Sequence, residues 1–449
     1  MYTDSRGHAL TTSEEMTARS CAKAMDHYMQ RKSDVSVHLQ TALEHDPECA
    51  IAHAYQGLML HGAKNLTYQS LVSESLSKAK QYASGLTDRE QLYIEALEFA
   101  SSGQLLDSVS CFESILEYCP TDGFALSLCQ AELFWLGDMK RSLAASASVA
   151  PAWNESISGY SEFLAVHAFD LEEAGQYAQA EKAGRKAVDL QPANIWATHA
   201  VAHVMYMQGR HAEGVEWISG LQNNWGDVGQ MQFHVWWHKC LFHLERSEHD
   251  AVLEAYDKWV RNREHSLVQA LPDLYIDLQN GSSLLWRLEL AGVDVEDRWL
   301  EMAEVVATRA SDMSNPFTSA HFAVIFAAVN DFKACEQLVN AIQHYTHHGE
   351  GTLTKHYAKA ALPAAQAAIA HRRGDYHKVV DVLYPARKDL WMMGGSHAQQ
   401  DLFFQMLVDA AAKTGDTLKV NALLSEIEQI GFVEPAQLNS YKVIMQSVQ

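Results

Sequence analysis

Apolar residues recur every three or four positions through most of the chain, which is the spacing of one helix face. The stretch HFAVIFAAV at residues 321–329 is typical: it is apolar but short. No segment alternates Val, Ile or Thr with polar residues between turn signals, as strands do. The pattern therefore predicts roughly twenty helices arranged in hairpins, with one continuous core running through them.

One segment has the features of a complete repeat. In EEAGQYAQAEKAGRKAVDLQP, the residues Gly175, Tyr177, Ala180, Ala187 and Pro192 match the small, aromatic, small, small, proline pattern of a tetratricopeptide repeat. Gly175 allows a sharp turn after the first helix, and the alanines allow two antiparallel helices to approach closely. Pro192 cannot continue the preceding helix. The segment predicts a helical hairpin.

Similar turns recur before and after this repeat. They are expected at Gly103, Gly209, Ser247–His249, Asn330–Phe332 and Gly374–Tyr376. The later turns are irregularly spaced. We therefore expect an all-α fold, a tetratricopeptide-like solenoid of helical hairpins that forms a curved superhelix with irregular C-terminal repeats. Residues 1–150 would hold N-terminal helical repeats and 151–449 the tetratricopeptide-like repeats, within one continuous solenoid.

Charge and cysteine content narrow the choice of partner and compartment. The 449 residues include 34 Lys and Arg against 56 Asp and Glu, a net charge of −22. This balance argues against nucleic acid and against an anionic membrane surface. No secretory signal or membrane-length apolar run is visible. Seven cysteines without a CxxC motif indicate reduced thiols, so we expect a cytoplasmic protein.

Histidines gather on one predicted side of the helices. When positions are counted back from each turn, five of the 23 histidines fall opposite the core side of the helical wheel, where such repeats line a concave groove. Two acidic residues share or border that sector. We expect these residues to be catalytic: His199, His203, His234, His238, His321, Glu172 and Glu173. Neighbouring helices pack about 8–10 Å apart, so His203 and His238 should lie within about 15 Å of each other.

Other polar and aromatic positions would complete such a site. Trp237 is expected beside His238 in the groove, and Asp277 and Asn280 are three apart, on one helix face. Arg287, surrounded by leucines in the same helix, would need a carboxylate partner. The expected substrate-binding side chains are therefore Trp237, Asp277, Asn280, His397 and Asp401.

A glycine-rich loop, MMGGSHAQQDLF, is expected to open another helix. Ser396 and Gln399 have the spacing of a capping box. His397 and Asp401 are four apart on the first turns of that helix. A helix N-terminus after Gly394 and Gly395 could accept an anionic group, which is why His397 and Asp401 are candidates for substrate binding.

Several motifs together resemble one family. They are THAVAHVMYMQG, HVWWHKCLFHLERSEHDA, SSLLWRLELAGV, SAHFAV and GGSHAQQDLF. The chain resembles the tetratricopeptide repeat protein 38 family and its bacterial relatives over nearly its whole length. It departs from the family at Ser319, His397 and Gln400, where the family often has an acidic residue, an asparagine and an arginine. The resemblance implies the fold and no established activity.

Three functions fit the pattern. The first is an enzyme that acts on a small molecule in a His, Glu and Trp pocket by imidazole acid/base chemistry. The second is a metal site in which His199, His203, His234 and His238 hold a divalent transition metal such as zinc or iron. The third is an adaptor that binds a peptide or protein in the groove, the common function of such repeats. Histidines that merely pack or are solvated remain the plainest alternative.

Absent motifs limit the enzyme classes. The chain has no Walker loop, GxGxxG, GxSxG, HExxH or CxxC sequence. Groove positions carry His, Glu and Trp rather than the Lys, Arg and Asn of a carboxylate clamp. We therefore predict an enzyme with a small-molecule ligand, by acid/base or metal-assisted chemistry, with the adaptor as the alternative.

Overall fold

Each predicted inter-helix turn is present and contains a residue with a left-handed backbone. The φ angles are 77° at Gly103, 74° at Gly175, 69° at Gly209, 56° at Ser247, 58° at Asn330 and 74° at Gly374. Glycine adopts this conformation without steric cost, and asparagine tolerates it better than most residues. A new helix begins two residues after each of these positions. The turns confirm the predicted division into helix pairs.

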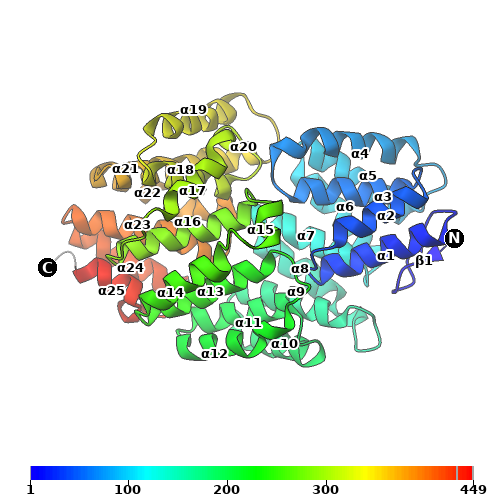
Figure 1. Cartoon of the computed structure of the whole chain (residues 1–449), viewed down its shortest axis with the longest axis horizontal. Helices are drawn as coiled ribbons and strands as arrows, with labels where there is room; N and C mark the ends of the chain where they lie inside the picture. Colours follow the sequence, from blue (N-terminus) through cyan, green and yellow to red (C-terminus); the bar gives the residue numbers. More distant parts are fainter. Residues whose placement is uncertain (1, 431–432, 447–449) are drawn as a thin grey trace. The chain divides into compact units, whose positions relative to one another are not determined.

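The structure is a computed structural model that describes residues 2–430 and 433–446. It falls into two compact units (Figure 1). Unit 1 comprises residues 1–134, 138–201 and 223–231, and unit 2 comprises 135–137, 202–222 and 232–449. The expected division at residue 150 stays a prediction, because compactness alone does not show which part folds independently.

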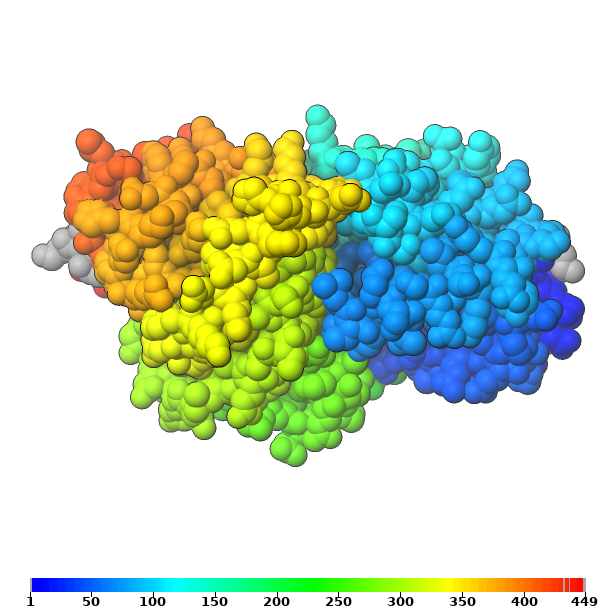
Figure 2. Space-filling model, turned by 90° about the horizontal axis from the view of Figure 1, so that it is seen from above, coloured from blue at the N-terminus to red at the C-terminus, as the bar shows by residue number. Residues whose placement is uncertain are grey.

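Unit 1 consists of helix pairs that follow a short N-terminal hairpin. Its elements are β1 Tyr2–Thr3, β2 Ala9–Leu10, α1 Glu15–Met29, α2 Val35–His45, α3 Ala50–Gly62, α4 Gln69–Gln81, α5 Asp88–Ser101, α6 Leu105–Tyr118, α7 Gly123–Leu136, α8 Met139–Val149, α9 Tyr160–Glu173 and α10 Tyr177–Leu190. Consecutive helices pack as pairs: α1 with α2, α3 with α4, α5 with α6 and α9 with α10. Helices from residues 50–100 lie side by side on one face of this unit (blue in Figure 2).

Helix α11 is divided between the units after Val201, and the helices from α11 onward are less regular in length. They are α11 Ile195–Met207, α12 His211–Leu221, α13 Met231–Glu245, α14 His249–Ala255, α15 Ser266–Ala270, α16 Tyr275–Leu290, α17 Arg298–Val306, α18 Pro316–Ala328, α19 Phe332–His348, α20 Leu353–His356, α21 Leu362–Arg372, α22 Tyr376–Ala386, α23 His397–Lys413, α24 Thr417–Gln429 and α25 Asn439–Gln446. Two π-helical turns, Tyr256–Val260 and Tyr357–Ala361, interrupt this series. The predicted irregularity of the later repeats corresponds to these short and broken helices.

Small residues allow the close helix packing that the sequence predicts. Ala180 and Ala187 on α10 are fully buried. At Gly184 on the same helix, an added Cβ would lie 2.6 Å from the side chain of Val201 on α11. Because that distance is far below van der Waals contact, the residue must stay small. The chain is thus an all-α, tetratricopeptide-like solenoid of helical hairpins.

Two details differ from or extend the predictions. Residues 2–3 and 9–10 form a minimal antiparallel pair, with Tyr2 opposite Leu10, although no strand was expected. Four backbone residues are too few for the periodicity of a strand to be visible in a sequence. Among the described residues, no helix combines the length and apolar character needed to cross a bilayer.

Candidate metal centre

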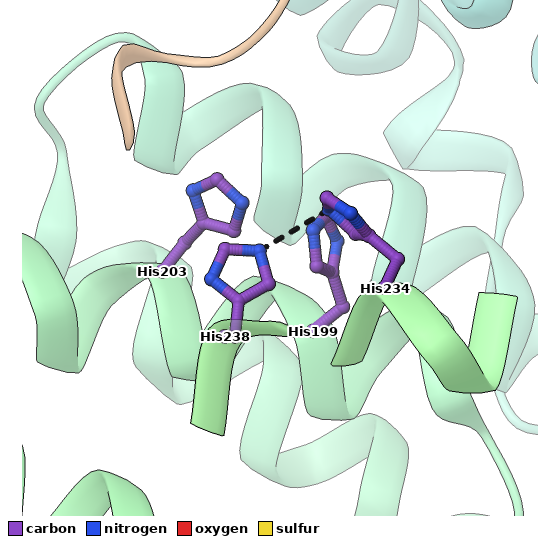
Figure 3. A group of neighbouring side chains, drawn as sticks. All are labelled: His199, His203, His234 and His238. Atoms are coloured by element: carbon purple, nitrogen blue, oxygen red, sulfur yellow. Dashed lines mark hydrogen bonds between the residues drawn. The ribbon is translucent and has the colours of Figure 1, made fainter. Parts of the chain in front are cut away.

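Two helices of neighbouring repeats carry the histidine pairs. His199 and His203 lie one turn apart on α11, and His234 and His238 lie one turn apart on α13, so each pair projects from one helix face. One nitrogen from each ring lies within 4.8 Å of those of the other three. Figure 3 shows the four rings turned toward one another. We call His199, His203, His234 and His238 the four-histidine cluster.

The cluster depends mainly on unit 2. His203, His234 and His238 all belong to that unit, and the rings of His203 and His238 have centroids 4.3 Å apart. The predicted closeness of His203 and His238 is therefore confirmed. The units divide within α11, after Val201. His199 is placed by the same continuous helix that carries His203.

Hydrogen bonds orient the two rings on α13. Nδ1 of His234 lies 2.8 Å from Oδ1 of Asn280 on α16. Because an amide oxygen only accepts, Nδ1 carries the hydrogen and Nε2 of His234 offers a lone pair. Nε2 of His238 lies 3.2 Å from this Nε2 (dashed in Figure 3). Two nitrogens bound to one tetrahedral zinc ion lie about 3.3 Å apart, given Zn–N bonds of about 2.0–2.1 Å.

Burial determines the charge of these rings. His234 and His238 are 3% and 0% exposed. Burial, with a smaller contribution from the nearby His203, lowers the pKa of His234 to about 3. The same causes, with His234 as a further neighbour, hold the pKa of His238 well below its ordinary value. Both rings are therefore neutral near pH 7, which is the form that binds metal ions.

Helix α16 adds a buried polar row beside α13. Besides the Asn280 contact, Nε1 of Trp237 donates to Oγ of Ser283 at 3.1 Å, and Arg287 donates to the same oxygen at 2.8 Å. Asp277, one turn before Asn280, is fully buried, and neither of its carboxyl oxygens has a hydrogen-bond partner. Burial raises the pKa of Asp277 to about 8, so this carboxyl is mostly protonated near neutral pH.

The predicted groove side of these helices is buried and not open to solvent. All four cluster histidines, as well as His321 and Trp237, are at most 3% exposed. The helical wheel gave the correct common direction but could not show what lies there. In unit 2, α16 covers α13 on this side, as the Asn280 and Ser283 hydrogen bonds show.

The three other predicted catalytic residues differ: His321 lies apart, whereas Glu172 and Glu173 form with His203 a group whose possible ligand atoms lie within 4.8 Å of one another. His321 on α18 donates from Nδ1 to the carbonyl oxygen of Phe317 at 2.9 Å and packs between Phe317 and Phe403. It is not among the residues whose donor atoms converge. Glu172 and Glu173 end α9 in unit 1, and both are buried.

Of the two candidates on α23, Asp401 belongs to an internal network. Asp401 is buried, lies 4.0 Å from Arg287, and accepts hydrogen bonds from Gln405 at 2.6 Å and from Tyr441. The predicted carboxylate partner of Arg287 is thus confirmed. Burial raises the pKa of Asp401 above its usual value, although Arg287 opposes the change. His397 is the first residue of α23, after Ser396. The predicted capping box of Ser396 and Gln399 is present.

Two features were not predicted from the sequence. Ser283 lies three positions after Asn280 and therefore on the same helix face. His38 lies four residues after Asp34, a spacing that was a usable signal for their contact. His27, Asp34 and His38 form a second group whose possible ligand atoms lie within 4.8 Å of one another.

Comparisons with known proteins add the following. No protein-family model matches the chain. Among solved structures, it is similar to yeast Tom70, with 14% sequence identity and a TM-score of 0.39, over 96% of this chain and 88% of that chain. A similarity at this level carries no information about function.

Proposed function

We propose that this protein binds a divalent transition metal ion through the four-histidine cluster and uses it to act on a small polar molecule. The observation that carries the proposal is the convergence of four histidine nitrogens within 4.8 Å in a buried site. The 3.2 Å separation of the two α13 nitrogens already matches the ligand spacing around zinc.

The donor set favours certain ions. Imidazole nitrogens suit zinc, copper, iron and nickel, whereas calcium and magnesium prefer oxygen ligands. Asn280 supports His234 from behind, as the hydrogen-bonded partners of metal-binding histidines usually do. Three histidines are enough to hold a catalytic zinc ion, so the fourth position can be left for a substrate.

The polar row of α16 supports a small-molecule substrate. Both carboxyl oxygens of Asp277 and Nδ2 of Asn280 are buried without a hydrogen-bond partner. Each such group costs about 1–3 kcal/mol unless water or a ligand satisfies it. A bound metal would supply Lewis-acid chemistry. Protonated Asp277 could hold and donate a proton, and Asn280 could position a carbonyl or hydroxyl group.

Metal analysis and titration test the proposal. The protein is purified without chelators or a histidine tag, and bound metals are measured. The metal-free protein is then titrated with Zn²⁺ by calorimetry, and Co²⁺ absorption reports the coordination geometry. We expect the wild-type protein to bind at least one ion tightly. A variant in which both His203 and His238 are substituted should lose this ion. A wild-type protein that takes up no Zn²⁺ would rule the proposal out.

A second candidate is an adaptor that binds an acidic peptide, for which a surface hollow in unit 2 provides the supporting observation. Residues of α19, α21 and α22 line a hollow of about 720 Å³. Its lining includes apolar side chains and three cationic ones, Lys333, Arg373 and Lys378, which outnumber the two acidic ones, Glu336 and Asp375. The buried histidines are not open to a peptide, so an adaptor would use this hollow instead.

The two functions separate by mutation. Charge reversal at Arg373 and Lys378 should abolish binding of acidic peptides and leave metal content unchanged. Substitution of His203 or His238 should lower the metal content and leave binding of acidic peptides unchanged. An acidic peptide library that fails to bind the wild-type protein would exclude the adaptor.

A further inference from the structure

A second group of metal-binding side chain types lies in unit 1, where α1 meets α2. Nδ1 of His27 lies 2.6 Å from Oδ1 of Asp34, and Nε2 of His38 lies 3.2 Å from Oδ2 of the same carboxylate. The two imidazole rings are nearly perpendicular, with centroids 4.8 Å apart. We call His27, Asp34 and His38 the surface triad.

The local fold holds Asp34 in an unusual role. Asp34 is the N-cap residue of α2, where an aspartate normally accepts a hydrogen bond from the first turn of its own helix. Here its side chain makes no capping hydrogen bond. Both carboxylate oxygens face the histidines instead. The Asp34 carboxylate thus contacts two imidazoles in place of the backbone of its own helix.

The loop that presents Asp34 is firmly anchored within unit 1. Arg31 adopts a left-handed φ of 59°, which is uncommon for a residue other than glycine. The loop is pinned by a bridge between Lys32 and Val228, by a 2.6 Å ion pair between Lys32 and Asp227, and by a 2.8 Å hydrogen bond from Gly229 to the Arg31 carbonyl. A rigid loop positions its ligand before an ion arrives.

The donor types and exposure match an open cation site. Two histidines and one carboxylate are a recurrent ligand set for zinc and for non-haem iron, with the remaining positions taken by water or substrate. The side chains are 14%, 44% and 16% exposed for His27, Asp34 and His38. An ion could therefore enter directly from solvent, and water could complete its coordination.

We propose that the surface triad is a second binding site for a divalent transition metal ion, independent of the four-histidine cluster. The competing explanation is a metal-free ion pair that joins α1 to α2. An ion pair explains the hydrogen bonds, but it does not require the carboxylate to face two converging rings. The two explanations differ in whether Zn²⁺ protects these side chains.

Zn²⁺ titration of matched variants tests the proposal. We compare the wild-type protein with Asp34→Asn and His38→Ala, and use His45→Ala as the control, because His45 is an exposed histidine on the same helix, outside the triad. We expect Asp34→Asn and His38→Ala each to lose about one Zn²⁺ equivalent or at least tenfold in affinity at one site. His45→Ala should match the wild-type protein. Equal binding by all four proteins would overturn the proposal.

Histidine labelling of the wild-type protein gives a readout that does not depend on any variant folding. Diethyl pyrocarbonate modification is measured by mass spectrometry with and without Zn²⁺. Zn²⁺ should slow modification of His27 and His38 at least tenfold and leave His45 unchanged. Unchanged labelling of His27 and His38 would overturn the proposal. A His238→Ala variant that still shows this protection would separate the surface triad from the four-histidine cluster.

Discussion

The two histidine groups of this protein hold their imidazole rings together in opposite ways. The four-histidine cluster is buried and consists of imidazole rings alone, although His203 is also grouped with the carboxylates of Glu172 and Glu173. The surface triad is partly exposed and places one carboxylate between its two rings. Each could hold a cation, but they differ in what keeps the imidazoles in place when no cation is bound.

The difference shows what burial and charge each contribute. Burial lowers the pKa of His234 to about 3 and holds the pKa of His238 well below its usual value, so these two rings remain neutral and pack together without repulsion. At the surface triad, burial also lowers the pKa of His38, but the charge of Asp34 opposes the change. Burial therefore keeps the α13 pair neutral, whereas the partly exposed pair gains order from a carboxylate between its rings.

The largest expected effect is the loss of metal from the buried cluster. His238→Ala should lower Zn²⁺ affinity at that site by at least a hundredfold, because a ligand nitrogen is removed. Where Zn²⁺ is present at about a hundred times its dissociation constant, the wild-type protein should gain about 2.7 kcal/mol of stability, which the variant should lack. Calorimetry and denaturant unfolding with and without Zn²⁺ measure both quantities.

His321→Ala is the matched control for this substitution. His321 is as buried as His238 and belongs to the same unit, but its donor atoms lie outside the cluster. It should lose stability from the cavity that is left, with Zn²⁺ affinity unchanged. If His321→Ala reduced Zn²⁺ binding as much as His238→Ala, the effect would come from disturbed packing and not from a lost ligand.

The next effect tests whether burial alone can set the charge of a group. Asp170 on α9 is fully buried and accepts hydrogen bonds from Gln130 and Ser142, both at 2.8 Å. Burial raises its pKa from 3.8 to about 6 despite these hydrogen bonds. Between these two values the folded protein binds more protons than the unfolded chain. Stability should therefore fall by about 2 kcal/mol as pH rises from about 4 to about 6.

Asp170→Asn removes the titrating group and keeps its shape. The free energy of unfolding of the wild-type protein, relative to this variant, should fall by about 2 kcal/mol between pH 4 and pH 7. Chemical denaturation at several pH values measures the difference, in which other titrating groups cancel. Asp189→Asn, at an exposed position on α10, should show no such trend. A flat difference for Asp170→Asn would mean that the buried carboxyl does not control this slope.

Helix pairing was predictable because it depends on local signals. Gly175 and Asn330 marked turns whose backbone few residues adopt, and both have a positive φ. The capping box at Ser396 was likewise readable from four consecutive positions. The N-terminal pair of two-residue strands was not predictable, because its residues carry no periodic pattern.

The site was predictable in its members but not in its environment. The four-residue spacing placed His199 with His203 and His234 with His238, and the repeat positions gave them a shared direction. Their burial depends on α16, which packs over α13 although it lies in a distant part of the sequence. No local sequence pattern indicates such a contact. For the same reason, the hydrogen bond from His234 to Asn280 could not be foreseen.

A smaller effect should follow from removing that hydrogen bond. Asn280→Ala should lower the Zn²⁺ affinity of the cluster about 10–100-fold, because the His234 ring loses the partner that fixes its orientation. Gln279→Ala is the control: the neighbouring side chain is equally buried, but it donates to Thr318 and does not contact a cluster histidine. Calorimetric titration of the two variants with Zn²⁺ should distinguish an effect of the His234 ring orientation from an effect of lost packing. Equal affinities would show that Asn280 is not a supporting partner.

The smallest effect should come from the surface triad without metal. Asp34→Asn weakens two contacts between the carboxylate and the imidazoles, yet Asp34 is 44% exposed, and even exposed ion pairs contribute only about 0.2–1 kcal/mol. The metal-free variant should therefore unfold within about 1 kcal/mol of the wild-type protein, because water replaces the lost contacts at little cost. Zn²⁺ should then stabilise the wild-type protein more than the variant, and denaturant unfolding with and without the ion measures both differences. A large loss of stability in the absence of metal, with no added response to Zn²⁺, would mean that the carboxylate joins α1 to α2 and holds no ion. The four-histidine cluster and the surface triad would then differ in how their side chains are held in place, and only the cluster would remain a candidate metal site.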